Sequence, residues 1–141
     1  MQITEHFARW EFECRDGTQY PCKWIDDRLF VLCSILEKIR SRISEAAGRD
    51  VKLKITSGYR TKKYNDNLIK QGVGAARRSK HISGQAADFR PVNGKNKSWV
   101  SIEALYYCIK QMIEKGEIPD GGLHKYQKFI HYDIAKPRRW K

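Results

Sequence analysis

Residues 79–91 read SKHISGQAADFRP and place two side chains of metal-binding type beside a predicted strand. The segment AADFRPV, residues 86–92, is predicted to be a strand that stops near Pro91, before the polar loop NGKNK. His81 stands seven positions before Asp88, and the small residues between them would let the backbone approach a bound metal closely. The same spacing also fits a solvated loop histidine followed by a carboxylate at the start of a strand. The segment is therefore either a plain turn into a strand or half of a metal site.

The chain before this segment predicts a long helix, a strand and a short helix. From Ile25 the apolar residues recur at spacings of four and three, which places them on one helix face, and Gly48 is a suitable helix end. In VKLKIT, residues 51–56, apolar residues alternate with lysines, as in a half-buried strand. The turn SGYR then leads to a short helix over residues 61–72, which a basic loop follows.

The chain after this segment predicts one more helix and one more strand. Ser98 is the expected N-cap of a helix over residues 99–115, and Gly116 ends it. After the turn PDGG, the segment KFIHYDI, residues 128–134, alternates again. We therefore expect an α+β fold in which a small, mostly antiparallel or mixed sheet packs against helices, with residues 1–141 forming a single domain. The chain has no GxGxxG or P-loop sequence that would support a nucleotide site.

The composition indicates a globular, strongly basic protein. Lys and Arg number 28 against 16 Asp and Glu, which gives a net charge of +12, and 40% of the residues are hydrophobic. Such a charge attracts nucleic acid, a membrane surface or an anionic bacterial cell wall, although a solvated basic surface has the same composition. The sequence shows neither the apolar core of a signal peptide nor a stretch long enough for a membrane span. We expect synthesis in the cytoplasm and release by cell lysis or another route.

The four cysteines do not define a metal-binding motif. Cys33 and Cys108 fall in apolar helical patterns and are expected to be buried thiols. Cys14 and Cys22 flank a polar stretch and could close a small loop. Because no CxxC pair occurs, a zinc ribbon is not expected.

Histidines are few, which narrows the choice of metal ligands. The chain has four histidines, and His131 lies inside the last predicted strand. If that strand and the strand of residues 86–92 are neighbours, His81, Asp88 and His131 meet at one point. Two imidazoles and one carboxylate are a usual ligand set for catalytic zinc, with the fourth position open to water.

Three motifs in this order resemble those of the zinc D-alanyl-D-alanine carboxypeptidases and the related peptidoglycan endopeptidases. They are SGYR, SKHISGQAAD and GG-x3-Y-x2-FIHYD, and the N-terminal EHFARWEFEC is similar to the opening of that family. The second motif matches the family pattern S-x-H-x-x-G-x-A-x-D at every fixed position, namely Ser79, His81, Gly84, Ala86 and Asp88. The resemblance covers nearly the whole chain and extends to phage and prophage members of the family.

The resemblance implies a zinc cleft on the sheet and assigns roles to individual residues. His81, Asp88 and His131 would bind one zinc ion. Arg60 of SGYR would hold a substrate carboxylate or stabilise the developing oxyanion.

The general base is the part of the resemblance that departs from the family pattern. Many members carry an acidic residue where this chain has Lys128. Asp133 lies two residues after His131 and would face the same side of the strand, so it would either orient that ligand or accept a proton. His124, in the turn before the last strand, is a further candidate for this role, and Tyr126 is expected to line the pocket.

The function implied by the resemblance is hydrolysis of peptide bonds in the stems or cross-links of bacterial peptidoglycan. Removal of a terminal D-alanine and cleavage of a cross-link both fit, and we favour the second. The expected partner is peptidoglycan peptide, with no nucleic acid or membrane, and the expected state is a monomer. Two alternatives are a weak or inactive peptidoglycan-binding module of the same fold and a basic nucleic-acid-binding protein. The second lacks any helix-turn-helix, RNA-recognition or zinc-finger signature.

Overall fold

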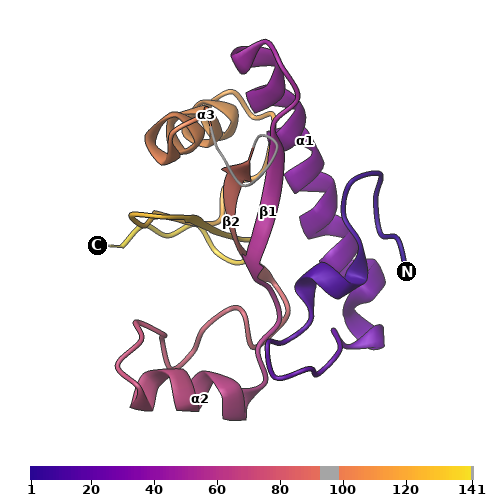
Figure 1. Cartoon of the computed structure of the whole chain (residues 1–141), viewed down its shortest axis with the longest axis vertical. Coiled ribbons are helices and arrows are strands. Elements are labelled where there is room, and N and C mark those ends of the chain that lie inside the picture. The colour runs from indigo at the N-terminus through magenta and orange to yellow at the C-terminus, as the bar shows by residue number, and fades with distance from the viewer. Residues whose placement is uncertain (93–98, 141) are drawn as a thin grey trace.

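The computed structural model describes residues 1–92 and 99–140, which form an α+β structure built on one four-stranded sheet (Figure 1). The strands lie in the order β1-β2-β4-β3, and each pairs antiparallel with its neighbour. The expected fold class is confirmed, and of the two predicted sheet types the antiparallel one is present. The strands are β1 (Lys52–Ser57), β2 (Ala86–Val92), β3 (Gly122–Lys125) and β4 (Ile130–Asp133).

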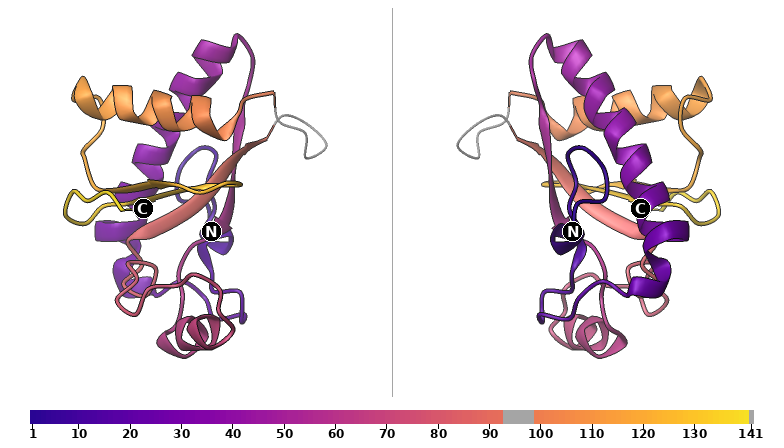
Figure 2. Two further views of the ribbon diagram at one scale, coloured as in Figure 1. Left: turned by 90° about the vertical axis from the view of Figure 1, so that its left-hand side faces the viewer. Right: turned by 90° about the vertical axis from the view of Figure 1, so that its right-hand side faces the viewer.

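The described ranges contain three α-helices, and the first of them carries much of the core. α1 (Phe30–Ala47) runs alongside β1, whereas α2 (Lys62–Lys70) and α3 (Ile102–Glu114) lie at opposite ends of the molecule (Figures 1 and 2). The apolar stripe predicted for α1 is buried, and Gly48 ends the helix with a left-handed φ of 69°. The predicted start at Ile25 is a five-residue π-helical segment, Ile25–Leu29, which leads directly into α1.

The two faces of the sheet differ in chemistry, as strand alternation requires. One face packs into the hydrophobic core through Leu53, Phe89, Ile130 and other apolar side chains. The opposite face carries Asp88 and His131, which are paired directly across β2 and β4. The alternation predicted for β1 and β4 is therefore present, and it turns the polar residues of these strands toward one side.

One predicted helix boundary differs from the structure, and one strand was missed. α3 begins at Ile102 rather than at residue 99, because the hydroxyl of Ser101 accepts a hydrogen bond from the Ala104 amide and caps the helix there. The predicted cap at Ser98 lies outside the described residues. β3 was not predicted at all, since it has four residues and begins in the PDGG segment that indicated a turn.

The N-terminal segment contributes to the core. Phe7 and Phe12 are buried, and the Phe12 carbonyl accepts a hydrogen bond from the Tyr59 amide at 2.8 Å. Among the cysteines, Cys33 is buried as expected and Cys108 is only partly buried. Cys14 and Cys22 are both free thiols. None of the helices in the described ranges has the length and apolar character needed to cross a membrane.

Candidate metal centre

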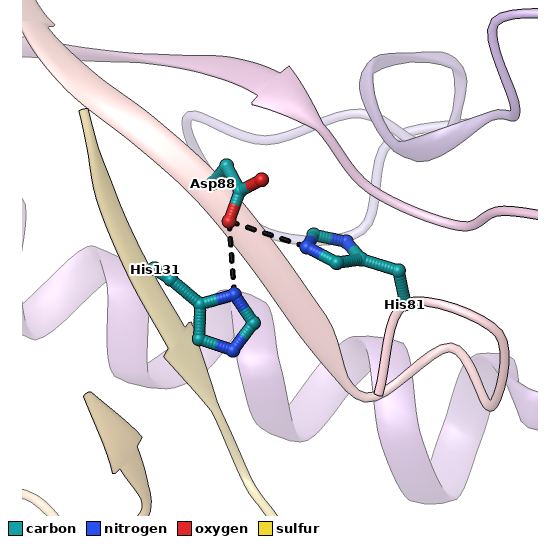
Figure 3. Close-up of side chains that lie close together, drawn as sticks. All are labelled: His81, Asp88 and His131. Carbon is teal, nitrogen blue, oxygen red and sulfur yellow. Dashed lines mark hydrogen bonds and ion pairs between the residues drawn. The ribbon is translucent and has the colours of Figure 1, made fainter. Parts of the chain in front are cut away.

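His81, Asp88 and His131 lie together in a buried cluster on the polar face of the sheet (Figure 3). Asp88 Oδ1 is 3.2 Å from His81 Nε2 and 2.9 Å from His131 Nδ1. One ligand atom from each residue lies within 4.8 Å of the other two. Figure 3 shows both imidazoles turned toward the carboxylate, His81 from the turn before β2 and His131 from β4. The structure thus brings together the three residues expected to bind a metal.

A single row of residues crosses all four strands at this point. Ser57, Asp88, His131 and His124 are successive cross-strand partners from β1 to β3. A β-bulge after Ile55 adjusts the register of β1 so that Ser57 lies opposite Asp88. Directly opposed residues face the same side of a sheet, so the row gathers these polar side chains on one surface.

The turn that carries His81 depends on Gly84. This glycine has a φ of 69°, a conformation that favours glycine, and a Cβ added there would lie 2.7 Å from the Tyr20 hydroxyl oxygen. The Gly84 carbonyl accepts a hydrogen bond from that same hydroxyl at 2.5 Å. Ser79 completes the turn, because its hydroxyl accepts a hydrogen bond from the His81 amide at 3.2 Å. These contacts explain the fixed Ser and Gly of the sequence motif.

An outer hydrogen bond determines which nitrogen of His81 faces the cluster. His81 Nδ1 lies 2.7 Å from the Gly58 carbonyl oxygen, so Nδ1 carries the proton and Nε2 is left with its lone pair toward Asp88. Gly58 must be glycine, since a Cβ there would lie 2.6 Å from the Phe12 Cα. The N-terminal segment therefore supports the residue that orients His81.

Asp133 has the corresponding role for His131. Its Oδ2 is 2.7 Å from His131 Nε2, which leaves Nδ1 of the same ring facing the cluster. Asp133 has no exposed surface, and its Oδ1 accepts hydrogen bonds from the Gly122 and Ala135 amides and from Arg138. Arg138 also pairs with Oδ2. Both carboxylate oxygens are thus committed to contacts within the protein.

The electrostatics of the cluster keep the carboxylates ionised. Burial alone would raise the pKa of Asp88 and of Asp133, but the contacts with the histidines, and for Asp133 also with Arg138, hold both pKa values well below the usual range. Burial lowers the pKa of His81. Burial acts in the same direction on His131, but its hydrogen bonds to Asp133 and Asp88 outweigh that effect and raise its pKa.

The residues fit a divalent metal ion. Each imidazole has one nitrogen held by an outer acceptor and the other turned inward, and the inward nitrogens converge on a carboxylate oxygen. Two nitrogen donors and one oxygen donor at one point form a three-residue set of the kind that holds catalytic zinc. One side of the cluster opens into a cavity of about 750 Å³, so a further coordination position would be accessible.

Arg60 lies at the edge of this cluster, as its place in SGYR led us to expect. Its Nη2 is 3.5 Å from Asp88 Oδ2, and its other nitrogens donate to Ser57 Oγ and to Asn65 Oδ1. Asn65 is fully buried on α2 and also donates to the Ala76 carbonyl. The guanidinium is therefore held in place by side chains from β1 and α2.

His124, Tyr126 and Trp140 form an aromatic group next to His131. The ring of Trp140 stacks on His124 with centroids 5.1 Å apart and meets the His131 ring edge-on at the same distance. Trp140 Nε1 donates to the Tyr126 hydroxyl at 3.2 Å. His124 thus lies on the same face as the cluster, beside a metal-ligand candidate, and Tyr126 lines the cavity as expected.

A second cavity, of about 730 Å³, lies on the other side of Asp88. Arg60, Leu68, Asp88 and Phe129 line both cavities, which therefore meet at the cluster. Lys128, which stands where many relatives carry an acidic residue, is exposed and lines the second cavity.

The fold and this centre define a class of protein, namely an α+β domain with a candidate metal site of two histidines and one aspartate buried on an antiparallel sheet. A comparison with protein families finds that the peptidase M15 family matches residues 5–133. The chain belongs to this family of zinc peptidases, which includes the D-Ala-D-Ala carboxypeptidase-like enzymes that the motifs resemble. A search of curated proteins finds no match.

Sequence reasoning did not assign roles to Gly58, Gly122, Arg138 and Trp140. Gly58 acts through its backbone carbonyl, which every residue type has, so the sequence does not identify it as an acceptor. A Cβ at Gly122 would lie 2.2 Å from Asp133 Oδ2, so the second Gly of PDGG is explained by packing around a buried carboxylate. Arg138 and Trp140 follow the last strand, and only the return of the chain across β3 places them beside the centre.

Proposed function

We propose that the protein is a zinc-dependent peptidase that cleaves peptide bonds in the stems or cross-links of bacterial peptidoglycan. Membership of the M15 family supports peptidase chemistry. The observation that carries the proposal is the convergence of two oriented imidazoles and one carboxylate at a cavity. When bound by three protein ligands, zinc lowers the pKa of a coordinated water molecule to about 7 and polarises the carbonyl group of the bond to be cleaved.

Arg60 is proposed to stabilise the oxyanion of the transition state. It is fixed by Ser57 and Asn65, and it lies where the two cavities meet, so a peptide that passes the metal centre would pass its guanidinium. A preorganised cation at this point would stabilise the negative charge that develops in the transition state, and this lowers the reaction barrier.

The remaining roles are divided between Asp133 and His124. Asp133 is proposed to position His131 rather than to accept a proton from water, because both of its oxygens are already occupied. His124 is proposed to accept the proton released by the attacking water and then to transfer it to the leaving amine, since it is half-buried and lies across from His131 on the same face. Trp140 would fix the orientation of its ring by stacking.

Cleavage within a chain fits the site better than removal of a terminal residue. The cavities on the two sides of Asp88 have similar volumes, about 730 and 750 Å³, and neither is enclosed. A peptide could therefore extend past the metal in both directions. This arrangement supports endopeptidase activity on cross-linked wall peptides.

Digestion of purified sacculi, followed by mass spectrometry of the released peptides, tests the proposal. We expect new peptide ends in the presence of zinc, none after treatment with a chelator, and recovery when zinc is added back. The His131→Ala variant is the matched control and should release nothing. Binding to sacculi without any cleavage would instead support the peptidoglycan-binding module, and it would overturn the proposed activity.

A further inference from the structure

The cavity on the β1 side of the metal centre is lined by four cationic side chains. Among the described residues these are Arg15, Arg60, Arg90 and Lys128, and the single acidic residue described in its lining is Asp88, which belongs to the metal cluster. The rest of the wall is largely apolar and includes Leu68, Pro91, Ile102 and Phe129. A concave site of mixed apolar and cationic character suits a ligand that is itself amphipathic and anionic.

Two of the four cations are already committed to contacts within the protein. Arg60 contacts Asp88, Ser57 and Asn65. Arg15 donates to the Ile55 and Thr56 carbonyls, each at 3.3 Å. These contacts fix Arg15 along the edge of β1 but leave its positive charge unneutralised.

Arg90 and Lys128 form no ion pair with any described residue. Arg90 is half-buried and lies directly across β1 and β2 from Lys54, which is a further cation. Like charges in directly opposed positions of a sheet destabilise it. An anionic ligand in the cavity would reduce the repulsion between Arg90 and Lys54. Ligand binding would therefore account for two cations in directly opposed positions.

The position of Arg90 relative to Asp88 sets the distance to the reacting bond. Arg90 follows Asp88 by two residues on the same face of β2, and two residues of a strand span about 6–7 Å. An extended substrate peptide has the same repeat. A group held by Arg90 would therefore lie about two residues from the bond at the metal centre.

We propose that Arg90, together with Lys128 and Arg15, forms a carboxylate-binding subsite that selects peptides with an acidic group about two residues from the scissile bond. This inference rests on the proposed peptidase function and adds its substrate preference. Lys128, which departs from the acidic residue of many relatives, then serves to recognise substrate. The small size of the cavity and its junction with the metal centre favour a short acidic peptide over a long polyanion.

The test compares two fluorescein-labelled peptides that differ by one carboxylate. They are L-Ala-γ-D-Glu-L-Lys-D-Ala and the same peptide with D-isoglutamine, in which an amide replaces the α-carboxylate. Fluorescence anisotropy with chelator-treated protein measures binding without cleavage. We expect the acid to bind about five- to tenfold more tightly than the amide, because charge-assisted contacts are roughly twice as strong as neutral ones.

Three variants connect this preference to the subsite. Arg90→Gln should reduce the ratio of the two affinities to about one, and Arg90→Lys should retain part of it. Lys38→Gln removes one positive charge from an exposed position of α1, outside both cavities, and should keep the full ratio. Thermal unfolding of each variant checks that the fold is retained.

The possible outcomes separate this inference from the proposed function. A full acid-to-amide ratio in Arg90→Gln overturns the subsite even if sacculi are cleaved. A ratio that depends on Arg90 supports the subsite even if no zinc-dependent cleavage is found, and only the proposed function then fails. Displacement by a single-stranded oligonucleotide, with equal binding of the two peptides, would assign the cavity to a phosphate polymer and overturn the proposal.

Discussion

At the scale of single residues, the centre is organised by the acceptors outside it. The Gly58 carbonyl holds Nδ1 of His81 and the Asp133 carboxylate holds Nε2 of His131, so the two rings present different nitrogens to the same point. Without these acceptors each ring could adopt either tautomer and several orientations. Ordering of the ligands before metal binding reduces the cost of forming the site.

Arg60→Ala tests the oxyanion role at this scale. We expect turnover on wall peptides to fall by about 10²- to 10³-fold, the usual cost of removing one oxyanion donor. Zinc content, measured by metal analysis, should not change, because Arg60 is not among the three ligand candidates. Unchanged turnover in the loaded variant would contradict the proposed role.

Asp133→Asn tests the positioning of His131. We expect zinc affinity to fall by about 10- to 100-fold, as is usual when an outer partner of a ligand is removed. Competition with a fluorescent chelator measures this directly. Asp120→Asn is the matched control, because Asp120 pairs with Arg139 through an exposed contact of 2.8 Å and should leave zinc affinity as it is. Equal affinities in the two variants would argue against the positioning role.

At the scale of elements, the candidate site depends on the β3–β4 hairpin, which could not be predicted from the sequence. β1 and β4 could be predicted because their residues alternate, and in β1 Lys52 and Lys54 identify the outer face. β3 could not, since two glycines at its start suggest a turn and only four residues form the strand. Its pairing with β4 is a tertiary effect that local sequence does not encode.

Gly122→Ala tests how the β3–β4 hairpin supports the centre. The added Cβ would lie 2.2 Å from Asp133 Oδ2 and 2.6 Å from Arg138 Nη2, so the pair that holds His131 must move. We expect a loss of about 1–3 kcal/mol in the free energy of unfolding, as for overpacked sites, together with weaker zinc binding. Denaturant unfolding and chelator competition measure the two effects.

Gly74→Ala is the control for this substitution. Nothing lies within 4 Å of a Cβ at Gly74, so both quantities should stay close to those of the parent protein. If Gly122→Ala behaved like this control, the tight packing around Asp133 would not matter for the centre.

At the scale of the whole molecule, the three metal-ligand candidates join parts of the chain that are distant in sequence. The candidate ligand positions could be chosen from sequence because only four histidines occur and because His81 and Asp88 fall in one motif. Their convergence could not be derived from spacing, since it requires β4 to pair with β2 and the turn at Gly84 to fold back over Tyr20. The resemblance to a family supplied what the local patterns left open.

Removal of the metal should therefore weaken the whole fold. Zinc at about 100 times its Kd would stabilise the folded state by about 2.7 kcal/mol, provided that the unfolded chain does not bind it. We expect a chelator to lower the Tm of the zinc-loaded protein by several degrees in calorimetry. The His131→Ala variant should show little change on the same treatment, and an equal decrease in both proteins would contradict metal-linked stability.

The contact between Trp140 and His131 gives the protein an internal optical probe. The indole edge meets the imidazole ring with centroids 5.1 Å apart, while its other neighbours, His124 and Tyr126, hold it in place. Any event that alters the charge on that imidazole alters the electric field at the indole, and indole emission responds to such fields. The arrival or departure of a cation could then be followed by intrinsic fluorescence in real time, without a dye.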